Sequence, residues 1–194
     1  MSEISTKEIG VLDIETTGRN PNKGTIVEIG MCSLDLSNGH IKPLFDSVVK
    51  DKAFYDKYES YSLKNSWVFS NSDLTLADVE GAPSLKNVFK QVQKLLNAFA
   101  FTAYNRTFDF SFLECAGFTI PYKLPCPMLA ATPFCKLPGY YDKYKWPKVE
   151  EAWNKLCPEQ MNYIEAHRAY DDAVHEAIIV YELYNRKKWY PRLH

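Results

Sequence analysis

Two acidic side chains stand one residue apart at the end of an apolar run, within residues 9–18, which read IGVLDIETTG. Side chains at positions i and i+2 of a β-strand project from the same face, so Asp13 and Glu15 would lie together while Ile14 points into the core. Two carboxylates held side by side repel each other, and a bound cation would hold them there. Oxygen ligands of this kind suit Mg²⁺ or Mn²⁺. Taken alone, the pair also fits a strand end that carries two solvated acids.

Two later segments carry further candidates for chemistry: residues 104–113 read YNRTFDFSFL, and residues 167–173 read HRAYDDA. Asp109 follows an expected strand at the start of an expected helix, where backbone N–H groups also favour a carboxylate as an ordinary N-cap. His167 and Asp172 are five residues apart, and Asp171 is a competing neighbour. Together and in this order, the three segments resemble the DEDDh family of 3′→5′ exonucleases, from about residue 7 to about residue 185.

The resemblance implies a ribonuclease H-like α/β fold with a mixed central sheet that opens with an antiparallel three-strand meander and is flanked by helices. It implies that four acids hold two Mg²⁺ or Mn²⁺ ions and that His167 is the general base. The spacing H-x-x-x-x-D of the family selects Asp172, which leaves Asp171 to face solvent or to cap the helix. The implied metal ligands are Asp13, Glu15, Asp109 and Asp172, and the implied substrate-binding residues are Thr16, Thr17, Gly18, Asn105 and Phe108.

This residue set matches the needs of phosphodiester hydrolysis. Two metal ions about 3.5–4 Å apart can align a water and neutralise charge on the leaving oxygen. A histidine with an unperturbed pKa of about 6.5 can take the proton of that water near neutral pH. We expect a nuclease that acts on single-stranded 3′ ends and releases nucleoside 5′-monophosphates. DNA is favoured over RNA because the motif forms look most like those of proofreading subunits.

Two other functions stay open. One is an RNA 3′-end trimming or short-oligonucleotide nuclease. The other is a nucleic-acid-binding module with a dead site, whose signature would be a missing acid, and no acid of the motif set is missing. A polymerase partner also stays open, but the chain ends six residues after Lys188, so we expect no C-terminal tail to grip it. The sequence leaves the oligomeric state undetermined.

Composition sets the broad class of the protein. A chain of 194 residues with 46% hydrophobic residues is long enough for one globular domain, which we place at residues 1–194. A net charge of −1 argues against a polybasic binder whose affinity comes from bulk charge. Five widely spaced cysteines favour reduced thiols. The N-terminus lacks a signal-peptide pattern and no apolar run reaches about 18 residues, so a cytoplasmic location is expected.

Periodicity and turn residues predict the elements that must position these side chains. Strands are expected at 7–14, 26–36 and 41–49, with a hairpin turn at 37–40 and short helices and loops over 51–80. Ser84 would cap an amphipathic helix that runs to residue 99. The later elements are a short strand at 99–103, a helix at 108–116, a strand fragment and a broken helix within 121–138, a helix at 147–157 with Pro147 in its first turn, and a long helix at 169–188.

One stretch outside the motifs interleaves aromatic residues with lysines. Residues 139–146 read GYYDKYKW, which fits either a packed surface loop or a surface that contacts substrate. Trp67, Trp153 and Trp189 are expected to serve packing, and His175 to lie on the surface or in a packing contact.

Overall fold

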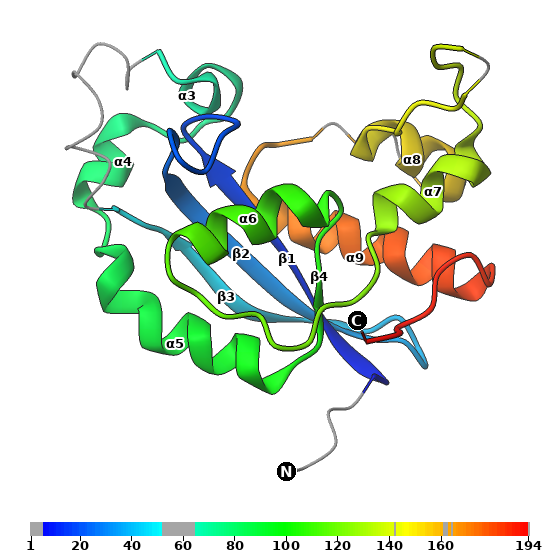
Figure 1. Ribbon diagram of the computed structural model, residues 1–194, viewed down its shortest axis with the longest axis horizontal. Coiled ribbons are helices and arrows are strands. Elements are labelled where there is room, and N and C mark those ends of the chain that lie inside the picture. Colours follow the sequence, from blue (N-terminus) through cyan, green and yellow to red (C-terminus); the bar gives the residue numbers. More distant parts are fainter. Residues whose placement is uncertain (1–5, 52–64, 142, 161–162, 164, 194) are drawn as a thin grey trace.

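The computed structural model describes residues 6–51, 65–141, 143–160, 163 and 165–193. Its centre is a mixed four-stranded sheet in the order β3-β2-β1-β4 (Figure 1). β1 pairs antiparallel with β2 and parallel with β4, and β2 pairs antiparallel with β3. The expected opening meander is confirmed. The strands are β1 (Glu8–Thr16), β2 (Ile26–Asp35), β3 (Ile41–Val48) and β4 (Phe101–Thr102).

Helices flank this sheet in the part of the chain that the structure describes. They are α3 (Trp67–Asn71), α4 (Leu76–Gly81), α5 (Leu85–Ala98), α6 (Arg106–Cys115), α7 (Pro127–Cys135), α8 (Val149–Leu156) and α9 (Ala169–Asn185). Ser84 caps α5 as expected, since its side chain accepts the N–H of Asn87. None of these helices is both long and apolar enough to cross a membrane.

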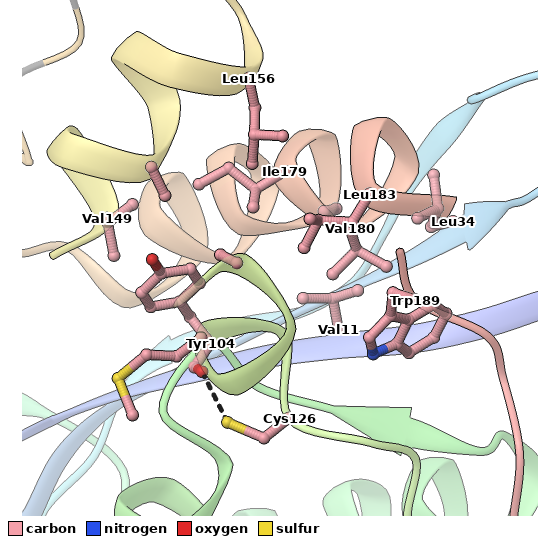
Figure 2. Close-up of a cluster of buried hydrophobic side chains, with 14 of the residues drawn as sticks. Val11, Leu34, Tyr104, Cys126, Val149, Leu156, Ile179, Val180, Leu183 and Trp189 are labelled. Carbon is pink, nitrogen blue, oxygen red and sulfur yellow. Dashed lines mark hydrogen bonds between the residues drawn. The ribbon is translucent and has the colours of Figure 1, made fainter. Parts of the chain in front are cut away.

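Alternation along the strands gives the sheet two apolar faces. Leu12, Ile14 and Ile29 point to one face, where they pack with residues of α5 and α6. Residues such as Val11 and Leu34 point to the other face, which α9 covers, and α7 and α8 pack against α9. Figure 2 shows the packing on this second face, where Ile179, Val180 and Leu183 of α9 lie beside the strands. β1 is therefore fixed from both sides, which makes its C-terminal end a rigid platform.

Three expected helix details are wrong. α6 begins at Arg106 and its N-cap is Asn105, so Asp109 lies inside the first turn and is not an ordinary cap. Pro147 precedes α8, whose N-cap is Lys148. α7 continues through Pro133 and is not broken there. In the expected region of short helices, α3 and α4 form as predicted, and residues 52–64 lie outside the described part of the chain.

Candidate active site

The end of β1 carries the two acids of the first motif. Asp13 pairs with Gly30 of β2, and Glu15 pairs with Glu28, so both acids project from the sheet face that α9 covers. Glu15 is buried, and Asp13 keeps part of its surface accessible. The predicted alternation is confirmed, with Ile14 buried in the opposite core.

Gly30 lets the start of α9 lie directly against this face. A Cβ atom at Gly30 would come within 2.2 Å of the backbone of Ala169 and Tyr170. No side chain fits in that gap, so glycine is required for the close approach of helix to strand. The approach brings Asp172, in the first turn of α9, to the side of β1 that carries Asp13 and Glu15.

Asp109 reaches the same place from the opposite side of β1. β4 pairs with Gly10 and Val11 of β1, which leaves the strand edge free further along. The backbone N–H of Ile14 donates a hydrogen bond to the Asp109 carboxylate at this edge. Asp109 is only 3% exposed, in the first turn of α6. The short strand thus makes room for a carboxylate where a longer strand would have paired.

His167 lies in the segment that leads into α9, in a left-handed backbone conformation with φ of 53°. Such a conformation is costly for a residue with a side chain and is held by its surroundings. Its Nδ1 is 4.0 Å from Oε1 of Glu165, and its ring meets the ring of Trp67 edge-on at a centroid distance of 4.5 Å. Ligand atoms of Glu15, His167 and Asp172 all lie within 4.8 Å of one another.

Trp67 therefore differs from its expected role in packing. Its side chain is 52% exposed and stands beside His167. Trp153 and Trp189 are buried as predicted. His175 stacks on Tyr163 at a centroid distance of 3.9 Å, which agrees with a packing contact.

The two adjacent aspartates of α9 have opposite surroundings. Asp172 is 1% exposed, and its carboxylate accepts hydrogen bonds from the Tyr163 hydroxyl and from the backbone N–H of Arg168 and Ala166. Asp171 is exposed, as the motif spacing implies. The burial difference supports Asp172 as the acid that belongs to the site.

An ion pair fastens the segment before α9 to β2. The guanidinium of Arg168 donates to Glu28 through Nε at 3.0 Å and Nη2 at 2.7 Å, and through Nη1 to Asp73 at 2.9 Å. Glu28 is 1% exposed and also accepts the N–H of Ala169 at 3.1 Å. This clamp fixes the residue next to His167. It also neutralises the negative charge of Glu28, which lies opposite Glu15 across the strand pair.

A fifth acid, Glu176, was missed by the motif analysis. It lies one helical turn after Asp172, is 3% exposed, and its Oε2 accepts the N–H of Tyr104 at 3.0 Å. Among the charges that act on Asp13, that of Glu176 is the largest. The helical spacing from Asp172 could have located it, but the spacing alone is equally common on solvated helix faces.

Burial and mutual repulsion raise the pKa of these acids. Burial is the main cause for Asp13, Glu15, Asp109, Asp172 and Glu176, and neighbouring carboxylates add to it for most of them. Burial, with the charges of Asp172 and Glu150, also raises the pKa of Glu165 to about 7. Buried carboxylates with such uncompensated charge fit divalent cations, since oxygen donors and excess negative charge are what Mg²⁺ and Mn²⁺ require.

The expected substrate-binding residues lie around this cluster. Thr16 and Thr17 are buried and shape the turn after β1: the Thr16 hydroxyl donates to the carbonyl of Gly18 at 2.8 Å, and Thr17 Oγ1 accepts the N–H of Thr25 at 3.0 Å. The carbonyl of Asn105 accepts the N–H of Phe108 at 2.8 Å. Phe108 packs on Phe112 at a centroid distance of 5.0 Å. The substrate roles of these residues remain predictions.

Solved structures of nucleases share this fold. The nuclease domain of 3′hExo, a DEDDh family member bound to rAMP, superimposes with a TM-score of 0.71 at 16% identity, covering 99% of this chain and 98% of that one. Escherichia coli exonuclease I in complex with a dA16 oligonucleotide gives a TM-score of 0.63 at 12% identity, covering 93% and 41%. The likeness confirms the expected ribonuclease H-like α/β fold.

Sequence comparison gives the family. The chain is 26% identical over 191 residues to the 3′-5′ exonuclease DinG of Bacillus subtilis (strain 168), an alignment that spans 93% of this chain and 18% of that protein. Residues 11–180 match the model of the RNase T family, described as exonuclease. With the match extending over most of its length, from β1 into α9, the chain belongs to this exonuclease family.

Proposed function

We propose that the chain is a metal-dependent 3′→5′ exonuclease that hydrolyses the terminal phosphodiester bond of single-stranded nucleic acid and releases nucleoside 5′-monophosphates. The observation that carries the proposal is the meeting of buried acids from β1, α6 and α9 beside a partly exposed histidine. The match to the exonuclease family supports it.

Asp13, Glu15, Asp109 and Asp172 would hold two divalent ions, Mg²⁺ or Mn²⁺. When bound, the ions would supply Lewis-acid activation of the attacking water and charge neutralisation at the leaving 3′-oxygen. Four carboxylates balance the charge of two divalent ions. These acids lie on β1 and in the first turns of α6 and α9. Because these elements are rigid, they favour a fixed geometry of the metal ligands.

His167 would accept the proton of the water. Its side chain is 21% exposed, so the ring reaches solvent, and it lies against the ring of Trp67 with Nδ1 4.0 Å from Oε1 of Glu165. A base needs a fixed position within hydrogen-bond reach of the water, and the constrained backbone at His167 helps to provide one. The backbone of the turn at 16–18 would meet the terminal nucleotide.

The form of the motifs favours DNA as the substrate. The alternative, an RNA-trimming nuclease, is supported by the likeness to 3′hExo, whose structure holds rAMP. The fold does not choose between them, because exonuclease I with a dA16 oligonucleotide shares it. A 2′-hydroxyl contact would separate the two substrates.

One assay tests the proposal. Single-stranded DNA and RNA of equal sequence, labelled at the 5′ end, are incubated side by side with Mg²⁺. We expect a ladder of shortening products that chelation with EDTA abolishes. Immediate release of a labelled mononucleotide from the 5′ end would contradict the polarity.

The two adjacent aspartates give a matched pair for the same assay. Asp172→Ala should lower the rate by at least about a hundredfold, because even residues that only support metal ligands cost about 10–100-fold. Asp171→Ala, which changes an exposed neighbour, should retain the rate within about twofold. Equal losses in two folded variants would contradict the register that selects Asp172 over Asp171.

A further inference from the structure

Four large aromatic side chains are exposed in one short stretch of the chain. Tyr140 is 89% exposed, Tyr141 95%, Trp146 65% and Tyr144 49%. They belong to residues 138–141 and 143–146, here called the aromatic turn, which projects beyond α7 and α8 (Figure 1). Exposed apolar groups gathered in one place generally mark a binding surface, whereas scattered ones need no explanation. Because these rings do not pack into the core, the packed surface loop is the less favoured of the two interpretations of residues 139–146.

The backbone of the aromatic turn is held in place. Pro138 and Tyr144 form an antiparallel bridge, and the N–H of Lys145 donates to the carbonyl of Leu137 at 3.1 Å. Gly139 has no room for a Cβ, which would lie 2.5 Å from the carbonyl oxygen of Lys143. Tyr141 has a φ of 55°, in the left-handed region. The rings are therefore presented from a defined turn, which lowers the entropic cost of binding.

The segment that follows the aromatic turn contacts the two segments that lead to Asp109 and to His167 of the candidate active site, here called the catalytic cluster together with Asp13, Glu15 and Asp172. The Tyr104 hydroxyl donates to the carbonyls of Pro147 at 3.1 Å and Lys148 at 3.3 Å, and the backbone of Tyr104 is bound to Glu176. At the start of α8, Glu150 accepts the N–H of Glu165 at 3.3 Å, two residues before His167. The segment that directly follows the aromatic turn is thus hydrogen-bonded to the chain before α6 and to the chain before α9.

The charge of this region differs from that of the whole chain. Residues 136–148 contain four lysines and one aspartate, in a chain of net charge −1. Lys145 pairs with Glu151, and Lys143 is an exposed residue between the aromatic rings. Rings with lysines beside them match a single-stranded nucleic acid, whose bases stack on aromatic faces and whose phosphates attract ammonium groups.

We propose that the aromatic turn binds the single strand upstream of its 3′ end, with bases stacked on Tyr140, Tyr141 and Trp146 while the terminal nucleotide occupies the catalytic cluster. The inference rests on the proposed function, because it names the surface that would guide the substrate to that site. It also predicts that strands long enough to span both places bind better than dinucleotides.

Binding and hydrolysis measured on the same variants test this inference. The binding probe is a 12-nucleotide single-stranded DNA labelled at the 5′ end, with a phosphorothioate at its last linkage to slow hydrolysis, followed by fluorescence anisotropy. The hydrolysis probe is the p-nitrophenyl ester of thymidine 5′-monophosphate, which is small enough to occupy the catalytic cluster alone. The double variant Tyr140→Ala/Tyr141→Ala and the single variant Trp146→Ala are compared with the control Tyr140→Phe/Tyr141→Phe, which keeps both rings.

We expect the Kd of the 12-mer to rise about tenfold or more in the alanine variants, since stacking of each base on an aromatic side chain contributes about 1–3 kcal/mol. The phenylalanine control should bind within about threefold of the unmodified chain because its π-faces remain. Ester hydrolysis should not change in any variant. An unchanged Kd in the alanine variants, or an equal loss of ester hydrolysis, would overturn the inference. Ring-dependent binding without any hydrolysis would instead support it while contradicting the proposed function.

Discussion

Glu176 joins two of the helices that supply acids to the candidate site. Its carboxylate lies on the face of α9 that carries Asp172 and accepts the N–H of Tyr104, which precedes α6 and Asp109. It is therefore placed both to add negative charge near Asp13 and to hold α9 against the chain before α6. These two roles can be separated by substitution.

Glu176→Gln keeps an oxygen for the Tyr104 N–H and removes the charge, whereas Glu176→Ala removes both. We expect the glutamine variant not to lower the metal-free Tm, since it keeps the hydrogen bond and removes a buried charge, and to bind Mn²⁺ about tenfold more weakly, as substitution of a residue that supports metal ligands typically does. The alanine variant should also lose about 1–3 kcal/mol of stability, because it leaves a buried N–H without a partner. Calorimetric titration and thermal unfolding measure the two effects. Unchanged Mn²⁺ affinity in Glu176→Gln would show that the charge does not serve the site.

His167 is expected to move a proton without holding the metal. His167→Ala should then lower turnover by about 10²–10⁴-fold and keep Mn²⁺ affinity nearly intact, since the four acids remain. Asp13→Ala is the comparison, because it should weaken Mn²⁺ binding itself. Calorimetry beside turnover separates the two variants. A loss of Mn²⁺ affinity in His167→Ala as severe as in Asp13→Ala would make His167 a ligand, which its position near Glu15 and Asp172 allows.

At the scale of elements, the clamp between Arg168 and Glu28 holds the segment of His167 against the sheet. Arg168→Ala leaves the Glu28 carboxylate buried without its guanidinium partner. Because Arg168 is 34% exposed, we expect a loss of about 1–3 kcal/mol, below the 3–5 kcal/mol of a fully buried pair. In a chain of this size that loss would lower the Tm by about 2–12 °C.

Activity should respond to the same change. Arg168→Ala should lower kcat more than it raises KM, because the backbone at His167 would lose its anchor while the substrate surface stays. The matched control is Asp73→Ala, which removes the other carboxylate partner of Arg168. The side chain of Asp73 is 79% exposed. Its effect on stability should stay within about 0.5 kcal/mol. Equal effects of the two substitutions would show that the buried half of the clamp has no special role.

How far the elements could be predicted depends on how local their causes are. Strand alternation placed Asp13 and Glu15 on one face because the period of a strand is fixed by its geometry. The cap of α5 was predicted for the same reason, since Ser84 acts on its own first turn. The N-cap of α6 was not predicted, and Asn105 makes no side-chain cap hydrogen bond there.

Long-range contacts account for the rest of what the sequence did not reveal. The contact of Trp67 with His167 joins residues a hundred positions apart, so no local pattern signals it. Glu176 looks like any acid on an amphipathic helix until the sheet and Tyr104 surround it. The requirement for glycine at position 30 could not be predicted either, because the backbone of α9 excludes a Cβ there only once α9 packs against β2.

For the whole molecule, the acid cluster links folding to pH. Burial and like charges raise the pKa of Glu15 to about 9, and the pKa of Asp13, Asp109, Asp172 and Glu176 also lies above the usual range. In the unfolded chain these groups ionise near pH 4. Between those pH values the folded, metal-free protein binds more protons than the unfolded chain, so its stability falls as pH rises.

We therefore expect the Tm of the protein in EDTA to fall between pH 5.5 and pH 9. Each unit of pKa difference corresponds to about 1.4 kcal/mol, which is about 3–6 °C for a chain of this size. Saturating Mg²⁺ should raise the Tm by more at pH 9 than at pH 5.5, because the ion binds the ionised carboxylates and competes with protons at low pH. Differential scanning calorimetry at several pH values measures both trends.

The control is Glu15→Gln, which should flatten the fall of the Tm in EDTA and reduce the Tm shift caused by Mg²⁺. A metal-free Tm that rises toward pH 9 would contradict the raised pKa values, and a Mg²⁺ shift independent of pH would contradict metal binding by this cluster.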